Sequence, residues 1–142
     1  MEEKELHYLL LLAFNLSNKA IVPRTGRENL MPGQPKILEF LLAREGCTQK
    51  EIGEGCILDK STVTSLLSRM EENGLVRKEA GEADRRISNI FLTEKGKKTA
   101  EKVKEICAGV DQEAWGDISE EERKRFLETF RKILLNLKRG ER

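Results

Sequence analysis

The residues best suited to chemistry in this chain lie on one face of a helix that the sequence predicts over residues 60–73. Apolar residues recur there at positions i, i+3, i+4 and i+7: Val63, Leu66, Leu67 and Met70. This spacing is typical of a helix with one buried face. The remaining positions carry polar side chains: Lys60, Ser61, Thr62, Thr64, Ser65, Ser68 and Arg69. Hydroxyl groups can meet base edges closely, and Lys and Arg can pair with phosphates, so this face is suited to the major groove of double-stranded DNA.

The segments before this helix predict a helix-turn-helix. Thr48 and Glu51 are spaced as a capping box at the start of a short helix that ends near Glu54. Gly55 permits a sharp turn, and Asp59 is a good N-cap for the helix 60–73. Two short helices joined by a tight turn can present the second helix to DNA, although the same geometry also serves protein contacts.

A β-hairpin follows, with predicted strands over residues 75–79 and 87–92. Its tip, residues 80–86, carries Asp84, Arg85 and Arg86. An arginine pair in a loop is usually only solvated, but this pair lies one strand beyond the predicted recognition helix. There a guanidinium could enter a narrow minor groove while the neighbouring carboxylate orients it.

Helices are predicted on both sides of this region. The first covers residues 3–21 and is followed by an irregular stretch, 22–34, before a helix restarts near Pro35 and ends at Gly46. A long helix covers residues 93–111, and a second capping box at Ser119–Glu122 begins the last helix. That last helix is expected to bury its apolar residues: Phe126, Leu127, Phe130, Ile133, Leu134 and Leu137. The first helix is apolar on so many sides that a second subunit is the expected neighbour.

The composition limits the possible functions. A chain of 142 residues favours a single domain over residues 1–142, and its net charge of +1 provides no general attraction to phosphate. The apolar run 9–14 follows acidic residues, so we interpret it as a packed helix of a cytoplasmic protein without membrane contact. His7 and three scattered cysteines form no metal or disulfide pattern, and no phosphate loop or general base is evident. We expect no enzymatic activity, no cofactor and no metal.

Four motifs together resemble the multiple-antibiotic-resistance regulator (MarR) family. They are Leu58-Asp-Lys-Ser-Thr-Val-Thr-Ser-Leu-Leu67, Glu72-Asn-Gly-Leu-Val76, Asp84-Arg-Arg86 and Leu92-Thr-Glu-Lys-Gly96. The resemblance implies a mainly α fold with a small β-hairpin wing. Residues 34–93 would form a winged helix-turn-helix lobe, and residues 1–33 and 94–142 would form a dimerisation region.

The resemblance also implies a function, that of a homodimeric repressor on a palindromic operator. By position, Ser61, Thr62 and Ser65 would contact bases, Thr64 and Arg69 would support phosphate contacts, and Arg86 would enter the minor groove with Asp84 orienting it. Lys60 and Arg85 complete the predicted DNA-binding set. The chain departs from the family pattern at Ser65, where many relatives carry an arginine, and in the proline- and glycine-rich segment 30–35.

The sequence leaves more than one possibility open for how the protein is regulated. Similar proteins release DNA when a small anionic or aromatic effector binds, and Arg24, Arg27 and Trp115 could line such a site. Cys47 and Cys56 bracket the first helix of the helix-turn-helix and could form a redox switch, although small buried residues are the commoner role for cysteines, Cys107 included. A winged helix used only for protein contacts is the alternative function, and it would be far less sensitive to salt than DNA binding.

Overall fold

The computed structural model describes residues 4–140. In this range it is mainly helical, with six helices and one three-stranded sheet. The contacts divide the chain into one unit that ends at Val110 and a second that begins at Asp111. The mainly α fold with a small β wing is as the sequence predicts.

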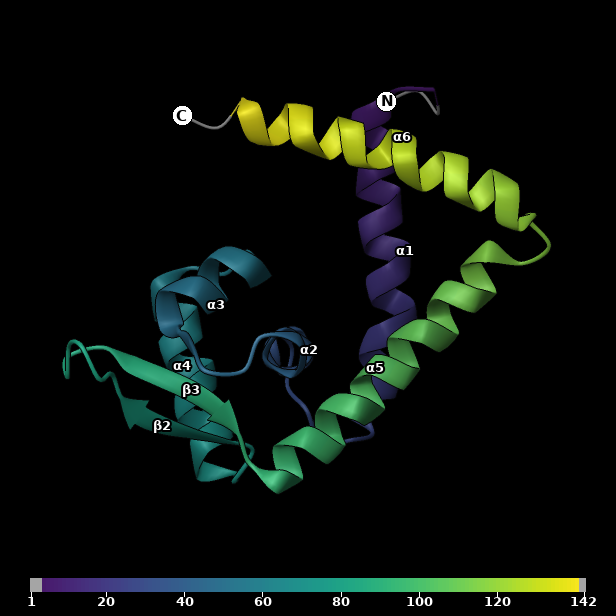
Figure 1. Cartoon of the computed structure of the whole chain (residues 1–142). Coiled ribbons are helices and arrows are strands. Elements are labelled where there is room, and N and C mark those ends of the chain that lie inside the picture. Colours follow the sequence, from purple (N-terminus) through teal and green to yellow (C-terminus); the bar gives the residue numbers. More distant parts are fainter. Residues whose placement is uncertain (1–3, 141–142) are drawn as a thin grey trace. The chain divides into compact units, whose positions relative to one another are not determined.

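The first unit contains a winged helix-turn-helix lobe (Figure 1). It consists of α2 (Gln34–Ala43), β1 (Cys47–Thr48), α3 (Gln49–Cys56), α4 (Lys60–Glu72), β2 (Val76–Ala80) and β3 (Ser88–Leu92). Side chains from all three helices and the sheet are fully buried in one core, among them Ile37 of α2, Ile52 of α3, Leu67 of α4 and Ile90 of β3. Burial of such aliphatic side chains from four elements fixes the orientation of α4.

Both predicted caps of the helix-turn-helix are confirmed. The Thr48 hydroxyl accepts a hydrogen bond from the Glu51 N–H, and the Glu51 carboxylate accepts one from the Thr48 N–H, which completes the capping box of α3. The Asp59 carboxylate accepts from the Thr62 N–H at 2.8 Å and caps α4. Ile57 ends α3 in the left-handed conformation, with φ of 56°.

The sheet contains a strand that the sequence analysis missed. Its order is β1-β3-β2, and both pairings are antiparallel. Cys47 pairs with Ile90, and Thr48 with Asn89. A two-residue strand has no alternating pattern of its own, because only its distant partner defines it.

The first helix is longer than predicted. α1 runs over Leu6–Gly26 and passes through Pro23, where the sequence analysis placed an irregular stretch from residue 22. Thr25, in the last turn of α1, is 3% exposed, and its hydroxyl donates to the Val22 carbonyl of the same helix at 3.2 Å. α1 therefore continues for three residues beyond a proline, which removes one backbone hydrogen bond inside a helix.

The long helix α5 (Glu94–Trp115) approaches the lobe closely at Gly96. A Cβ atom at this position would lie 1.9 Å from the Leu75 carbonyl oxygen. Glycine is therefore required here by space and not by its backbone angles.

The second unit contains the end of α5 and the last helix, α6 (Glu120–Arg139). The Ser119 hydroxyl accepts from the Glu122 N–H, which is the first of the two bonds of the predicted capping box. Trp115, Phe126 and Phe130 form an aromatic row, with ring centroids 6.0 and 5.4 Å apart.

The prediction that α6 buries its apolar face is wrong for the single chain. No residue of α6 is buried, and Phe126, Leu134 and Leu137 are each about half exposed. The helical spacing of these apolar residues is as predicted, but within residues 4–140 none of them is buried.

Among residues 4–140 no helix is both long enough and apolar enough to cross a membrane.

Candidate DNA-binding surface

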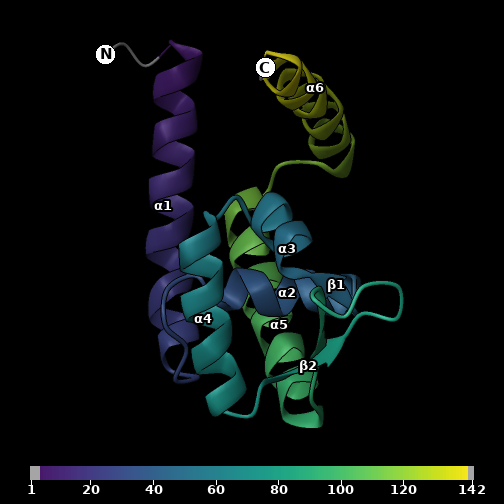
Figure 2. The ribbon, with the colours of Figure 1, turned by 90° about the vertical axis from the view of Figure 1, so that its left-hand side faces the viewer.

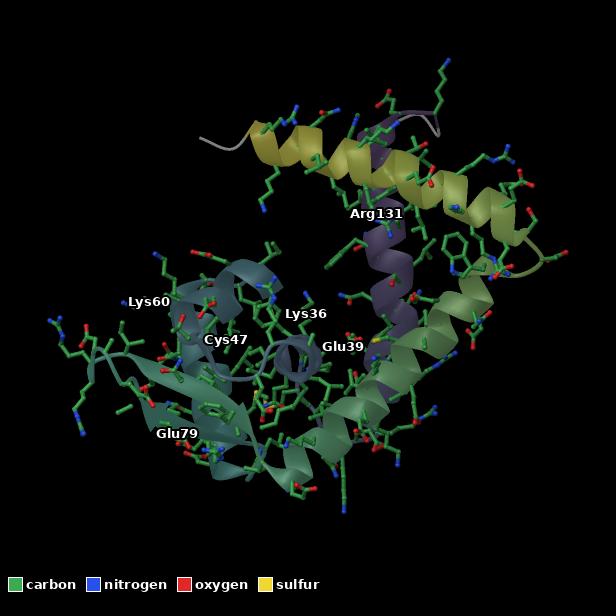
Figure 3. The ribbon with its side chains drawn as sticks, in the orientation of Figure 1. Lys36, Glu39, Cys47, Lys60, Glu79 and Arg131 are labelled. Atoms are coloured by element: carbon green, nitrogen blue, oxygen red, sulfur yellow. The ribbon has the colours of Figure 1, made fainter. Side chains whose placement is uncertain are left out.

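The polar face of α4 is open to solvent in the single chain. Its exposed members are Lys60, Ser61, Thr64, Ser65, Ser68 and Arg69. The apolar residues predicted for the opposite face, Val63, Leu66, Leu67 and Met70, are all buried. Lys60 projects outward from the start of the helix (Figure 3). α4 and the β2–β3 hairpin lie on the same side of the lobe, the side that faces the viewer in Figure 2.

Asp59 organises the first turn of this helix. Its Oδ1 atom accepts from the Ser61 hydroxyl and from the Thr62 N–H, both at 2.8 Å. Its Oδ2 atom accepts from the Thr62 hydroxyl at 2.9 Å. These three bonds, the backbone bond first, hold the pKa of Asp59 below its ordinary value, so the group stays ionised at neutral pH. The sequence predicts Asp59 as the N-cap, but it does not predict the hydrogen bonds that Asp59 accepts from the Ser61 and Thr62 hydroxyls.

Thr62 differs from its neighbours on the face because it is half-buried. It lines a cavity of about 380 Å³ with residues of α1, α2 and α4, among them Ile21, Lys36 and Leu66. Its hydroxyl is also committed to Asp59. Of the three predicted base-contacting residues, Ser61 and Ser65 are thus the exposed ones.

Two further positions on α4 have local partners. The Thr64 hydroxyl donates to the Lys60 carbonyl at 2.9 Å, a common arrangement one turn back along a helix. Nη1 of Arg69 lies 3.0 Å from the Met31 sulfur, and this contact connects the end of α4 to the segment before α2. The Ser65 hydroxyl has no hydrogen-bond partner within residues 4–140.

The tip of the wing carries an organised arginine. Nε and Nη2 of Arg86 each lie 3.1 Å from a carboxylate oxygen of Asp84, and the Arg86 N–H donates to the same carboxylate at 3.0 Å. The Arg86 side chain is nevertheless 91% exposed. The guanidinium and the backbone N–H of Arg86 together lower the pKa of Asp84, which remains a carboxylate at neutral pH. Arg85 is exposed beside them.

Cys47 and Cys56 lie in surroundings that disfavour the thiolate. Cys47 and Cys56 are buried, and burial raises the pKa of both thiols. The Cys56 sulfur lies 3.6 Å from the Lys36 carbonyl and lines a cavity of about 790 Å³ together with Phe14, Phe40 and Lys104. Within residues 4–140, no cluster of His, Cys, Asp and Glu side chains could hold a metal ion.

Several known proteins are similar to this chain. The sequence model of the MarR family matches residues 29–87. The transcriptional regulator HosA of Escherichia coli O127:H6 is 32% identical over 106 residues, which cover 75% of this chain and 78% of HosA. The chain belongs to the MarR family.

A second curated relative and a solved structure are also similar to this chain. The organic hydroperoxide resistance transcriptional regulator of Bacillus subtilis is 35% identical over 104 residues, or 73% of this chain and 71% of the relative. The solved structures include a crystal structure of the S. aureus MepR–DNA complex. The MepR chain in it is 25% identical to this chain and superposes with a TM-score of 0.83, and the match covers 94% of this chain and 99% of MepR. The chain is thus a DNA-binding transcriptional regulator with a winged helix-turn-helix, as its sequence motifs predicted.

Proposed function

We propose that this MarR-family chain acts as a homodimeric repressor of a palindromic operator, with α4 in the major groove and the wing tip in the minor groove. One observation carries the proposal: the hydroxyl-rich face of α4 and the exposed Arg86 lie on one side of a single lobe. In winged helices this arrangement lets one subunit contact adjacent grooves of one half-site. The similar MepR structure, which is a complex with DNA, supports this assignment.

The apolar surface of the chain supports a homodimer. Leu9, Phe14 and Leu16 of α1 are 47%, 56% and 63% exposed, and the apolar face of α6 is open as well. Large exposed apolar side chains gathered on two helices are typical of a surface that another protein covers. A second copy is the simplest occupant, because a two-fold dimer would present two copies of α4 to a symmetric operator.

The cavity that Thr62 lines is the proposed place for a small effector. At about 380 Å³ it is within the usual range for small-molecule sites, and it contacts α1, α2 and the first turn of α4. A ligand that enlarges this cavity would move α4 relative to α1. It would release DNA only if it binds the DNA-incompetent conformation more tightly. Lys36 and Glu39, both of α2 (Figure 3), line this cavity, so a ligand would meet one cation and one carboxylate there.

The decisive experiment is selection of bound sequences from random duplex DNA with the purified chain, repeated at several salt concentrations. The proposal expects an enriched inverted repeat whose half-sites lie about one helical turn apart, with affinity that falls steeply as salt rises. Binding that is insensitive to salt, or no enriched sequence, would contradict it. An effector screen then follows: compounds that raise the melting temperature are tested for loss of operator binding.

A further inference from the structure

The polarity of the hydroxyl of Ser61 is set by its neighbour Asp59. A serine hydroxyl has one hydrogen, and an ionised carboxylate can only accept hydrogen bonds. At 2.8 Å between Ser61 Oγ and Asp59 Oδ1, that hydrogen belongs to the contact with Asp59. The lowered pKa of Asp59 keeps the carboxylate ionised, so the bond is charge-assisted and stronger than a neutral one. What Ser61 can still offer to another molecule is its lone pairs.

The position of Ser61 makes this polarity relevant to DNA. It is the second residue of α4 and is exposed. In helix-turn-helix proteins, residues near the N-terminus of the recognition helix contact base edges. Of the hydrogen-bonding groups in the major groove, only the amino groups of adenine and cytosine donate, whereas N7, O6 and O4 accept.

We propose that Asp59 fixes Ser61 as a hydrogen-bond acceptor, so that this position of α4 selects an adenine or cytosine amino group in the operator. The inference rests on the proposed contact of α4 with bases. Asp59 is a positioning residue in this account, since it acts through Ser61. A base whose carbonyl or N7 faced Ser61 would meet a second acceptor, and the unpaired groups would be destabilising.

Ser65 provides an internal contrast on the same face. It is also exposed, but its hydroxyl has no hydrogen-bond partner within residues 4–140. Its hydroxyl can rotate to donate or to accept. Ser61 should therefore discriminate between donor and acceptor groups on a base, and Ser65 should not.

The test is a set of double-mutant cycles between the protein and single atoms of the selected operator. Purine in place of adenine removes the N6 amino group, and pyrimidin-2-one in place of cytosine removes the N4 amino group. The 7-deaza purines remove N7. Affinities are measured for the full chain, Ser61→Ala and the matched control Ser65→Ala. Removal of one amino group from a single half-site should weaken wild-type binding by roughly fivefold, the size of one hydrogen bond, and should have no effect on Ser61→Ala.

Two results would overturn the inference while leaving the proposed function intact. One is that Ser61 is coupled to N7, or to no base atom at all, although the operator is still bound specifically. The other concerns Asp59→Gly, which retains an acceptable N-cap but frees the Ser61 hydroxyl. The inference expects the amino selectivity to relax in this variant, so unchanged selectivity contradicts it. If the wild type selects no DNA sequence, the proposed function itself fails.

Discussion

Arg86 and Asp84 form a two-point pair at the tip of the wing, with Nε and Nη2 of Arg86 each 3.1 Å from a carboxylate oxygen. The pair orders a long side chain that is otherwise 91% exposed. An arginine that is ordered before binding loses less conformational freedom when it meets DNA. The neighbouring Arg85 is exposed as well, so the two residues allow a direct comparison.

Replacing Arg86 with alanine should weaken operator binding by about 1–3 kcal/mol without unfolding the protein, the size expected for one good DNA contact. Titration of the labelled operator measures the loss, and thermal unfolding checks the fold. Arg85→Ala gives a comparison within the predicted DNA-binding set, because it removes the same charge from the same loop without breaking the pair between Arg86 and Asp84. Equal affinities for the wild type and Arg86→Ala would exclude the minor-groove assignment.

The capping box of α3 predicts that the difference in stability between the wild type and Glu51→Gln depends on pH. The hydrogen bonds from Thr48, led by the one from its backbone N–H, lower the pKa of Glu51 below its ordinary value of 4.5. A carboxyl group whose pKa is lowered in the folded state contributes stability above its unfolded pKa, and this stability is lost as pH falls through the folded pKa. Wild type should therefore melt at a higher temperature than Glu51→Gln at pH 7, and the gap should close below pH 4.5.

Thermal unfolding of both proteins from pH 7 to pH 3 measures this gap. A gap that stays constant with pH would mean that Glu51 contributes through packing and not through its charge. Asp111→Asn, at an acidic residue of α5 outside the capping box, is a control for general effects of removing a carboxylate.

The features that the sequence predicts are those encoded by residues close together in the chain. Thr48 with Glu51, and Asp59 with the apolar spacing of α4, define their helix starts within a few residues, and the structure has both. The sequence does not predict features that depend on distant residues: β1 is defined by its pairing with Ile90 and Asn89. The continuation of α1 past Pro23 was also not predicted, because a proline usually marks a helix boundary. The half-burial of Thr62 was equally out of reach, since it depends on residues of α1 and α2 that pack nearby.

The close approach of α5 to the lobe predicts opposite effects of two identical substitutions. A Cβ at Gly96 would lie 1.9 Å from the Leu75 carbonyl oxygen, whereas a Cβ at Gly109 meets nothing within 4 Å. Gly96→Ala should destabilise the fold by about 1–3 kcal/mol through overpacking. Gly109→Ala should stabilise it by about 0.5–1 kcal/mol, because glycine is unfavourable in a helix interior. Denaturant unfolding measures both, and a neutral Gly96→Ala would show that α5 shifts freely against the lobe.

Burial of Cys47 and Cys56 predicts that peroxide does not alter operator binding through these two thiols. Oxidation requires the thiolate, and burial raises the pKa of Cys47 and Cys56. A thiol reagent should react with all three cysteines of the unfolded chain but spare Cys47 and Cys56 in the native one. Operator titration before and after peroxide treatment is the functional measurement. A loss of binding that Cys56→Ser prevents would instead establish the redox switch.

The exposed face of α6 predicts the effect of a charge placed on it. Leu134 is 49% exposed in the single chain, and in the proposed dimer a partner would bury it. Leu134→Glu should then produce a monomer, because a buried charge without a partner is costly. Lys132→Glu is the matched control: it introduces the same residue on the polar side of the helix, two positions away. Sedimentation gives the oligomeric state of each variant, and operator titration gives its affinity. Monomeric Leu134→Glu with weakened operator binding supports assembly through α6, whereas a dimer that binds the operator normally would place the interface elsewhere.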